Sequence, residues 1–539
     1  MAKMTGGRAA VRSLINNGVD TVFGLPGVQM DAFFNALHDE ANHVKVINAR
    51  HEQGVAYMAN GYAQATGKTG VYAVVPGPGL LNTTAALSSA YAVGAPVLAV
   101  AAEISSFAIG EKLGMLHEIN NQSEVLRGLT KWTGRAMHQS HIPGLIDEAF
   151  RQMQSGYVRP TAVEIPWDVL AEEADVRLLD AATANEAEPV DPDLIDAAAK
   201  ILGAAKKPMI VVGGGAMAAG EEVKALAEAL QAPVVSNRTA RGLLSDHHPL
   251  SVTSVVGFEL WPDVDAVLAI GTRLQAPRNN WGMHKDRKIV MIDIDPDAMF
   301  RTARSDVGIV GDARVGAHDL LAALGKYNSD RPSRAEEIQG VKAATLSAIE
   351  SKLGPQVAYQ KVLRNALDEE DILVDELTQV GYLTRAVFPV YGPNTLISTG
   401  YQGTLGAGFA TSIGAKVGQP DKRVLSINGD GGFLYTAAEL ATAVLHNIPI
   451  VAIVFADGYY GNVRRMQEEL WDNRVIATEL KNPDFVKMAE SFGAVGMRAE
   501  GPENLAKTLE EAFAMNGPVL IEVPMPKVPD PWPVIVPRR

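Results

Sequence analysis

Short apolar runs alternate with segments of helical period along most of this 539-residue chain. In the first third, the apolar runs fall at residues 21–24, 44–48, 70–75, 96–101 and 161–165. Helical patterns, for example at residues 51–66, separate them. Strands that are apolar throughout and alternate with helices are typical of a parallel sheet with helices on both faces. The same alternation returns twice more, so the sequence predicts an α/β chain of three doubly wound, mainly parallel-sheet domains.

Changes of composition divide the chain into three domains and a tail. Residues 176–192 are rich in Ala, Asp and Glu, and residues 328–352 are charged and polar, so we expect both to be linkers. Proline is so frequent at the end of the chain that no helix is expected there. The predicted domains and the proline-rich tail are residues 1–175, 193–327, 356–525 and 526–539.

The composition excludes several classes of function. With 48 basic and 62 acidic side chains the formal net charge is −14, which disfavours binding of nucleic acid or anionic lipid through overall charge. The absence of cysteine excludes disulfides, thiolate metal sites and a cysteine nucleophile. Residues 69–102 are uncharged, but the Gly and Pro residues at 76–79 divide them into two short runs, which favours a buried β–α–β unit over a membrane span. No secretory signal is recognisable, so we expect a cytoplasmic protein that contacts neither membrane nor nucleic acid.

Two aspartates each follow a short apolar run directly. Asp430 follows the run at residues 424–427, and Asp457 follows the run at residues 448–455. A helix predicted over residues 433–446 lies between them. A right-handed crossover would place both carboxylates at neighbouring carboxyl ends of parallel strands, which is the edge where open α/β sheets bind ligands.

A pair of carboxylates beside a glycine turn suits a divalent cation together with a phosphate. Asp430 and Asp457 can each give one oxygen to Mg²⁺, and the carbonyl of Tyr459 can give a third. Gly431 and Gly432 let backbone N–H groups approach a phosphate. Gly-Asp-Gly alone is usually a simple turn; the second carboxylate favours the metal site.

Several motifs resemble one enzyme family. Gly-Asp-Gly at residues 429–431, followed by Ala456-Asp457, resembles the thiamine-diphosphate signature, which normally ends in Asn-Asn. Arg50-His51-Glu52-Gln53-Gly54 is similar to the segment that carries the cofactor-activating glutamate of acetolactate synthases and their relatives. Further loops that resemble this family lie at residues 23–27, 76–79, 292–296 and 400–408. The chain is thus identified, over essentially its whole length, as similar to the acetolactate synthase, pyruvate oxidase and benzoylformate decarboxylase superfamily.

That resemblance implies cofactors, site residues and an assembly. The cofactors would be thiamine diphosphate and Mg²⁺, held between a pyrimidine-binding and a diphosphate-binding domain on either side of a central domain. Glu52 would hydrogen-bond N1′ of the aminopyrimidine, His117 would be a second catalytic residue, and Asp430, Asp457 and Tyr459 would hold the metal. The implied cofactor contacts are Pro26, Gly27, Gly77, Thr378, Gln379, Gly403, Leu405, Gly429, Gly431, Gly432 and Tyr459. The active sites would lie at the interface of a homodimer, in a homotetramer.

The chain departs from acetolactate synthases around the substrate. Those enzymes have Gln and Trp at the positions matched by His117 and Met466, so the acceptor pocket differs. The stretch that contacts FAD in them is not recognisable at residues 250–260, and the glycine turn at residues 213–215 is expected to be structural rather than a nucleotide contact. FAD is therefore not expected as a requirement. His117 is either a proton shuttle or a structural histidine.

Three interpretations of function remain. The first is acetolactate-synthase-like carboligation, in which a 2-oxo acid is decarboxylated and joined to a second carbonyl compound. The second is a lyase, decarboxylase or hydrolase that cleaves a 2-oxo acid, an acyloin-type 2-hydroxy carbonyl compound or a 1,2-diketone. The third is a degenerate, non-enzymatic homologue, which the intact Glu52, Asp430 and Asp457 disfavour.

Overall fold

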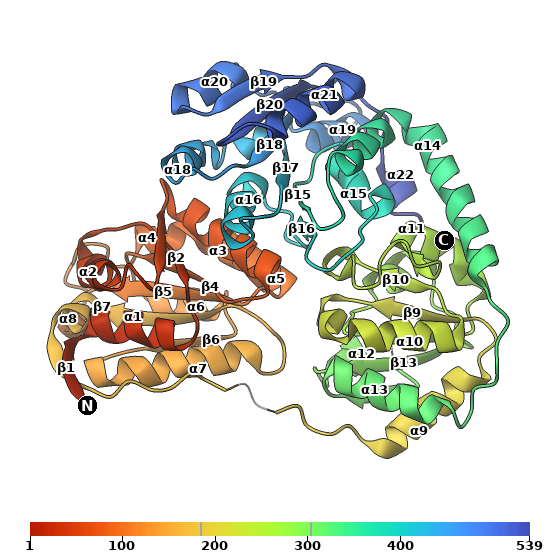
Figure 1. The fold of residues 1–539 in the computed structure, drawn as a ribbon, viewed down its shortest axis with the longest axis horizontal. Coiled ribbons are helices and arrows are strands. Elements are labelled where there is room, and N and C mark those ends of the chain that lie inside the picture. The colour runs from red at the N-terminus through yellow and green to blue at the C-terminus, as the bar shows by residue number, and fades with distance from the viewer. Residues whose placement is uncertain (184–185, 302–303, 539) are drawn as a thin grey trace.

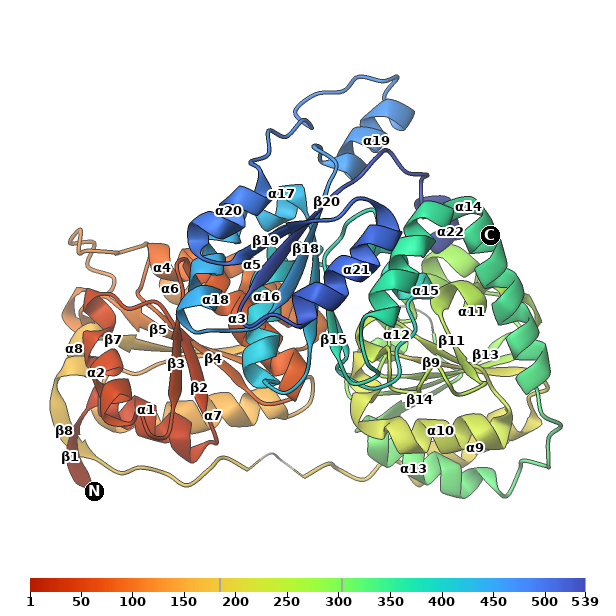
Figure 2. The ribbon, with the colours of Figure 1, turned by 45° about the horizontal axis from the view of Figure 1, so that its top comes forward.

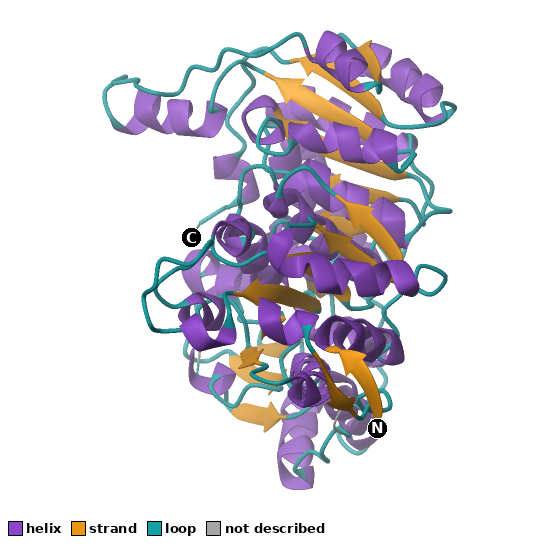
Figure 3. Ribbon diagram, turned by 90° about the vertical axis from the view of Figure 1, so that its left-hand side faces the viewer, coloured by secondary structure: helices purple, strands orange, loops and turns teal. Residues whose placement is uncertain are grey.

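Three six-stranded sheets, with helices on both faces, organise the chain (Figures 1 and 3). The structure is a computed structural model that describes residues 1–183, 186–301 and 304–538. Within these residues, every strand pair inside the three sheets is parallel. The predicted fold class is confirmed, and the three sheets lie inside the three predicted domains, whose boundaries stay predictions.

The N-terminal sheet has the order β3-β2-β4-β5-β7-β6. Its strands are β2 (Thr21–Gly24), β3 (Lys45–Asn48), β4 (Gly70–Val74), β5 (Val97–Glu103), β6 (Trp132–Arg135) and β7 (Thr161–Pro166). Its helices are α1 (Gly6–Asn16), α2 (Asp31–Asp39), α3 (Glu52–Thr66), α4 (Pro78–Asn82), α5 (Thr84–Val93), α6 (Gln122–Arg127), α7 (Ile142–Gln154) and α8 (Trp167–Ala171). An antiparallel pair, β1 (Ala2–Thr5) and β8 (Glu173–Val176), ties the two ends of this unit together.

The uncharged residues 69–102 form β4, α4, α5 and β5, so the prediction of a buried β–α–β unit is confirmed. Strand β5 is buried along its whole length. Among the residues that the structure describes, no helix has both the length and the apolar character needed to cross a bilayer.

The central sheet has the order β11-β10-β9-β12-β13-β14. Its strands are β9 (Pro208–Val212), β10 (Val234–Ser236), β11 (Ser251–Val252), β12 (Ala266–Ile270), β13 (Lys288–Asp293) and β14 (Val307–Val310). Its helices are α9 (Pro192–Ala204), α10 (Gly220–Leu230), α11 (Ser254–Leu260), α12 (Ala298–Arg301) and α13 (Ala313–Leu324).

The C-terminal sheet has the order β16-β15-β17-β18-β20-β19 and lies across the other two units (Figure 1). Its strands are β15 (Ile372–Asp375), β16 (Leu396–Ser398), β17 (Val424–Gly429), β18 (Val451–Ala456), β19 (Val495–Arg498) and β20 (Val519–Pro524). Its helices are α14 (Ala335–Asn365), α15 (Gly381–Val387), α16 (Ala407–Gly418), α17 (Asp430–Phe433), α18 (Leu440–Leu445), α19 (Gly461–Leu470), α20 (Phe485–Phe492), α21 (Gly501–Phe513) and α22 (Trp532–Ile535).

Most of the second predicted linker, residues 328–352, is helical and belongs to α14, whose kink falls at Leu353, just before Pro355, because proline removes a helical hydrogen bond. Two local predictions were wrong. The helix predicted over residues 433–446 is split at Thr436. The backbone of Thr436 leaves helical geometry, and its side-chain hydroxyl donates to the carbonyl of Gly406. The tail contains the short helix α22, because a proline in the first turn of a helix costs no hydrogen bond.

The N-terminal and C-terminal units pack through α3 and α16. A side chain at Gly61 would collide with the carbonyl of Thr411, and one at Gly414 would collide with the carbonyl of Met58. The two helices therefore pack backbone to backbone, which only glycine allows. One continuous apolar core joins the two units, so the N-terminus of α3 is held firmly against the C-terminal unit.

Candidate active site

The two predicted metal ligands lie side by side at the ends of neighbouring strands. Strands β17 and β18 are paired in parallel, with Gly429 opposite Phe455. Asp430 follows the first strand and Asp457 follows the second. Burial, together with the nearby charge of Asp430, raises the pKa of Asp457 to about 6. Two carboxylates held this close favour a bound cation.

Asp430 is fixed by three donors. The backbone N–H groups of Gly431 and Gly458 donate to its two oxygens at 2.9 and 2.8 Å. The side-chain amide of Asn482 donates at 2.6 Å. The other side-chain atom of Asn482, its Oδ1, is buried without a hydrogen-bond partner among the described residues, so it is an additional oxygen close to the carboxylate pair.

The predicted diphosphate contacts gather around the same strand ends. A side chain at Gly429 would lie 3.5 Å from Cγ2 of Thr378. A side chain at Gly461 would lie 3.0 Å from Nε2 of Gln379 and 2.6 Å from Oδ2 of Asp457. Gln379 Oε1 is buried without a partner in the described part of the chain. The loop after β15 therefore faces the carboxylate pair.

The glycine turn is as open as a phosphate cradle requires. A side chain at Gly431 would lie 2.8 Å from the ring of Tyr460, and one at Gly432 would collide with Glu376. Tyr459 donates its backbone N–H to Asp457 at 2.9 Å, and its ring lies 3.9 Å beneath the guanidinium of Arg464. Only glycine fits at both turn positions, so the backbone there stays open to a ligand.

The loop at residues 400–408 presents Leu405 to the outside. Gly403 and Gly406 have φ of 60° and 81°, which β-carbon sterics disfavour in other residues. Thr404 between them accepts a hydrogen bond from Tyr57 at 2.9 Å. Leu405 is 38% exposed and is therefore not an ordinary core leucine, which leaves it free to contact a ligand or a second chain.

Glu52 lies at the first turn of α3, against the proline–glycine turn at residues 76–79. His51 caps the helix by accepting from the N–H of Gln53 at 3.1 Å. The amide of Asn82 donates to Oε2 of Glu52 at 2.9 Å, and a side chain at Gly79 would lie 3.6 Å from Oε1. Glu52 is nearly buried, so Asn82 fixes the direction of its carboxylate.

His117 lies on the other side of that turn. Its carbonyl occupies the place of a side chain at Gly77, and both residues have positive φ, at 67° and 58°. Gln29 donates to the carbonyl of Leu116 at 2.8 Å. The Nδ1 atom of His117 is buried without a partner in the described residues.

Pro26 and Gly27 follow β2, whose neighbour in the sheet is β4. A side chain at Gly27 would lie 2.6 Å from Cγ1 of Val75. The predicted residues of the N-terminal unit thus gather at the carboxyl ends of β2 and β4. Within the described residues, no hydrogen bond or ion pair joins them to Asp430 or Asp457.

Several residues at the site have no sequence motif. Asn82 and Asn482 orient Glu52 and Asp430, and Glu439 accepts from the backbone N–H of His51 at 3.0 Å. Asn482 lies 52 positions after Asp430 in a loop without recognisable pattern. No signal in the sequence points to it, because the fold alone brings it to Asp430.

Three family models match the chain in order. They are the N-terminal TPP binding domain, the central domain and the C-terminal TPP binding domain of thiamine pyrophosphate enzymes, at residues 4–125, 195–324 and 378–523. The chain is 34% identical over 533 residues to a probable 2-ketoarginine decarboxylase of Pseudomonas aeruginosa, covering 96% of this chain and 94% of that protein. It is 32% identical to an acetolactate synthase of Bacillus subtilis, covering 97% and 94%.

This chain belongs to the thiamine pyrophosphate enzymes. The resemblance found in the sequence is thereby confirmed, and the chain is a thiamine-diphosphate-dependent transferase or lyase.

The residues present fit the cofactor of a thiamine pyrophosphate enzyme. The acidic pair Asp430 and Asp457 is suited to Mg²⁺. The side-chain oxygens of Gln379 and Asn482, which are buried without partners among the described residues, lie beside that pair. A side chain at Gly431 or Gly432 would take up the space in the glycine turn. Buried polar atoms normally have partners, so these are the groups that a diphosphate and its metal would satisfy.

A second buried acid lies behind the glycine turn of this enzyme. Glu376 accepts from the N–H of Gly406 at 2.7 Å, while its Oε2 has no partner among the described residues. Burial, with the charge of Asp375 next to it, raises the pKa of Glu376 to about 8. Glu376 is therefore protonated at neutral pH in the folded protein.

Replacing Glu376 by Gln should stabilise the cofactor-free protein more at alkaline than at acidic pH. Because the folded pKa is raised, the contribution of Glu376 to stability is complete below its unfolded pKa of 4.5 and is lost as pH rises to about 8. The gain of the variant over wild type should grow by at most about 4 kcal/mol across this range. Thermal unfolding of both proteins at about pH 5 and about pH 8.5 measures it; an equal difference at both pH values would contradict the prediction.

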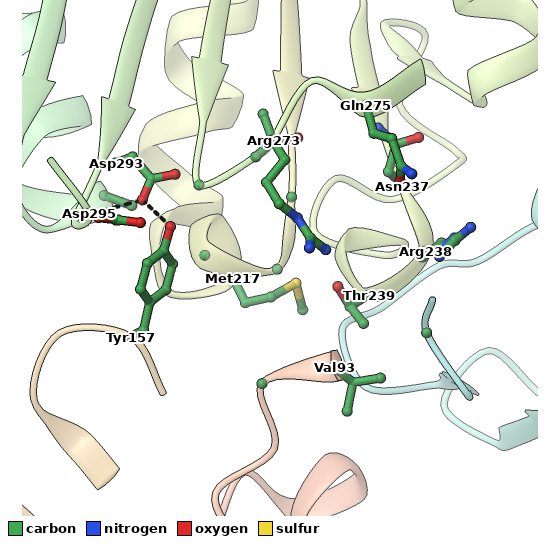
Figure 4. A pocket seen from close by; sticks show the side chains of 18 of the residues that line it. Val93, Tyr157, Met217, Asn237, Arg238, Thr239, Arg273, Gln275, Asp293 and Asp295 are labelled. Atoms are coloured by element: carbon green, nitrogen blue, oxygen red, sulfur yellow. Dashed lines mark hydrogen bonds between the residues drawn. The ribbon is translucent and has the colours of Figure 1, made fainter. Parts of the chain in front are cut away.

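A cavity of about 1550 Å³ lies where the three units of the enzyme meet. Figure 4 shows Arg273 and Asp293 on its central-domain side, with Tyr157 and Val93 opposite them. Tyr157 donates to Asp293 at 2.9 Å. The glycine turn Gly213–Gly215 also lines the cavity, whereas Arg278 donates to the carbonyl of Arg301 and is not part of the lining.

Arg238, Arg273 and Arg385 line the cavity, together with acidic side chains such as Asp293 and Asp295. Burial, with the nearby charges of Arg385 and Arg273, lowers the pKa of Arg238 to about 10. Arg273 also lies 4.6 Å above the ring of Tyr401. Three arginines beside a glycine turn suit an anionic ligand. The turn at residues 213–215 is therefore a stronger candidate for a ligand contact than the sequence alone indicates.

Proposed function

We propose that the chain is a thiamine-diphosphate- and Mg²⁺-dependent enzyme that decarboxylates a 2-oxo acid and joins the product to a second carbonyl compound. The observation that carries the proposal is the pairing of Asp430 with Asp457 around an open glycine turn. The similarity to an acetolactate synthase over nearly the whole chain supports carboligation.

The predicted metal and diphosphate residues have the following roles in this proposal. Asp430, Asp457 and the carbonyl of Tyr459 would hold Mg²⁺. The N–H of Gly432 would donate to the diphosphate, and Gly431, whose N–H donates to Asp430, would leave room for the phosphate to approach. When bound, thiamine diphosphate would supply a nucleophilic carbon that adds to the 2-oxo group and a cationic ring that accepts the electron pair released as CO₂ leaves.

The N-terminal unit would serve the aminopyrimidine end. Glu52, directed by Asn82, would hold a proton at N1′. Leu405, exposed on its glycine-flanked loop, would support the bent cofactor. Pro26, Gly27 and Gly77 would line the same end, and Thr378, Gln379, Gly403 and Gly429 the diphosphate side.

A decarboxylase that protonates its product is the second candidate. The observation that favours it is the buried, unpartnered Nδ1 of His117 on a strained backbone. A histidine beside the reacting carbon can act as a general acid. The similarity to a probable 2-ketoarginine decarboxylase points the same way.

Incubation with a panel of 2-oxo acids, including one that carries a guanidinium group, separates the two candidates. Release of CO₂ with a coupled product supports carboligation, whereas an aldehyde alone supports the decarboxylase. In the second case His117→Ala should lower aldehyde formation by roughly 10². If no 2-oxo acid in the panel releases CO₂ in a reaction that depends on thiamine diphosphate and Mg²⁺, both candidates are overturned.

The active sites are proposed to lie between two copies of the chain, which form a homodimer within a cytoplasmic homotetramer. Glu52 and His117 have no hydrogen bond or ion pair to Asp430 or Asp457 among the described residues. Large apolar side chains are exposed in both halves, among them Val28, Phe107 and Leu116 in the N-terminal unit and Leu434 and Tyr435 in the C-terminal unit. Packing these side chains against a second copy of the chain would bury apolar area, and it would bring the N-terminal half of the site in one copy to the C-terminal half in the other.

We predict that the enzyme does not require FAD. The stretch from Ser251 to Trp261 forms β11 and α11, and most of its apolar residues are buried in the central core. The purified protein should be colourless, and added FAD should leave turnover unchanged. A yellow preparation with flavin absorbance near one per chain, whose turnover falls when the flavin is removed, would contradict this.

A further inference from the structure

We propose that the C-terminal tail is a strap that positions helix α19 beside the active centre, with Asp530 and Trp532 as its positioning residues. The inference rests on the proposed function, because α19 borders the same site. No residue of α19 is buried, and the helix stands away from the C-terminal sheet (Figure 2). A ten-residue helix is marginal when left alone in water, so its position depends on the contacts that hold it.

The first turn of α19 touches the predicted cofactor residues. Gly461, its first residue, packs so closely that a side chain there would lie 2.6 Å from Oδ2 of Asp457 and 3.0 Å from Nε2 of Gln379. Asn462 and Val463 follow on this turn. A shift of α19 would therefore move the surface beside Asp457 and Gln379.

The tail holds this turn through a network of side chains. Trp532 donates its ring N–H to Oδ1 of Asn462 at 2.7 Å. Asp530 lies 3.1 Å from Arg465 in an ion pair whose side chains are 26% and 11% exposed. Arg465 in turn donates to Asn462. Partial burial makes such a pair worth more than an ion pair at the open surface.

The tail is itself anchored at several points away from α19. Gln356 donates to the carbonyl of Pro529 at 2.7 Å, and the ring of Trp532 packs against Tyr382 with centroids 4.9 Å apart. Ile535 is buried in the central core. Residues 535–538 also line the arginine-rich cavity. The strap thus runs from the central domain to α19.

The composition of the tail suits this role. Pro529, Pro531 and Pro533 alternate with the residues that make the contacts. Proline restricts the unfolded backbone, so less entropy is lost when the segment is ordered. A proline-rich segment can therefore hold α19 without a sheet or a long helix of its own.

The chain offers a matched control on the same helix. Lys527, also in the tail, lies 2.8 Å from Glu468 of α19, but its side chain is 82% exposed. An exposed ion pair contributes little. Lys527→Ala removes a tail–helix contact of the same kind and should behave as wild type.

Hydrogen exchange of the full-length protein, without substrate, tests the strap. Asp530→Ala and Trp532→Ala should speed exchange across α19 by roughly tenfold or more while exchange in β17 and β18 stays unchanged. Trp532→Phe, which keeps the packing on Tyr382 and loses the donor, should fall between wild type and Trp532→Ala. Unchanged exchange in α19 in all three variants, or an equal effect of Lys527→Ala, would overturn the proposal.

Kinetics give the second measurement. Because the strap acts through α19, Asp530→Ala and Trp532→Phe should lower kcat/KM about tenfold, mostly through KM, at unchanged melting temperature. A fall in kcat alone, or a lowered melting temperature in Trp532→Phe with α19 exchange like wild type, would count against positioning. An inactive wild-type protein would overturn the proposed function, whereas the exchange result would still decide the strap.

Discussion

Replacing Asp430 by Ala should abolish Mg²⁺-dependent binding of thiamine diphosphate. Asp430 is buried, and three donors fix its carboxylate. Its loss would leave the metal with one carboxylate, Asp457, and the diphosphate charge poorly compensated. Affinity should fall by at least about 100-fold. Calorimetric titration of the purified variant with cofactor and Mg²⁺ measures the loss directly.

The matched variant for this experiment is Asp457→Asn. The amide keeps an oxygen at the position where related motifs have Asn, and it removes the charge whose repulsion with Asp430 contributes to the raised pKa of Asp457. This variant should retain binding within roughly tenfold. Unchanged affinity in Asp430→Ala would show that the metal is held elsewhere, and the assignment of Asp430 would be lost.

Replacing Glu52 by Gln should leave cofactor binding intact and remove most activity. Gln has the same shape, and its oxygen can still accept from Asn82, which lies 2.9 Å from Oε2 of Glu52. The amide cannot share a proton with N1′ of the aminopyrimidine. Loss of a positioned acid–base group typically costs about 10²–10⁴-fold, and turnover should fall by that amount.

Hydrogen–deuterium exchange at C2 of bound thiamine diphosphate isolates this step from the rest of the reaction. The exchange rate should fall in Glu52→Gln. Asn82→Ala keeps the carboxylate of Glu52 but loses the hydrogen bond that orients it, so the exchange rate should fall less, by roughly tenfold. An exchange rate in Glu52→Gln equal to that of wild type would mean that another residue performs the proton transfer.

The fold class follows from patterns that are local in the sequence. Apolar runs separated by helical segments predict parallel sheets because only strands buried on both faces are apolar throughout. β4 and β5 were predicted within a residue or two for this reason. Departures occur where one side chain changes the local balance, as at Thr436 and Pro355.

The carboxylate pair could also be predicted from the sequence, because strand ends and a right-handed crossover bring Asp430 and Asp457 to one edge. Their partners could not. Asn482 reaches Asp430 from a loop of no regular pattern, and Asn82 reaches Glu52 from the end of α4, where no motif indicates that contact. A hydrogen bond between distant positions leaves no period or spacing to detect.

The sequence by itself determined the three sheets, the strand ends that bring Asp430 and Asp457 together, and the family. Only the tertiary structure decided that Arg238, Arg273 and Arg385 share one cavity and that the tail is tied to α19 through Asp530 and Trp532. The physical reason is the range of the interactions. Secondary structure depends on neighbours within a few residues, whereas charge clusters and interdomain contacts form between segments that meet only when the domains pack.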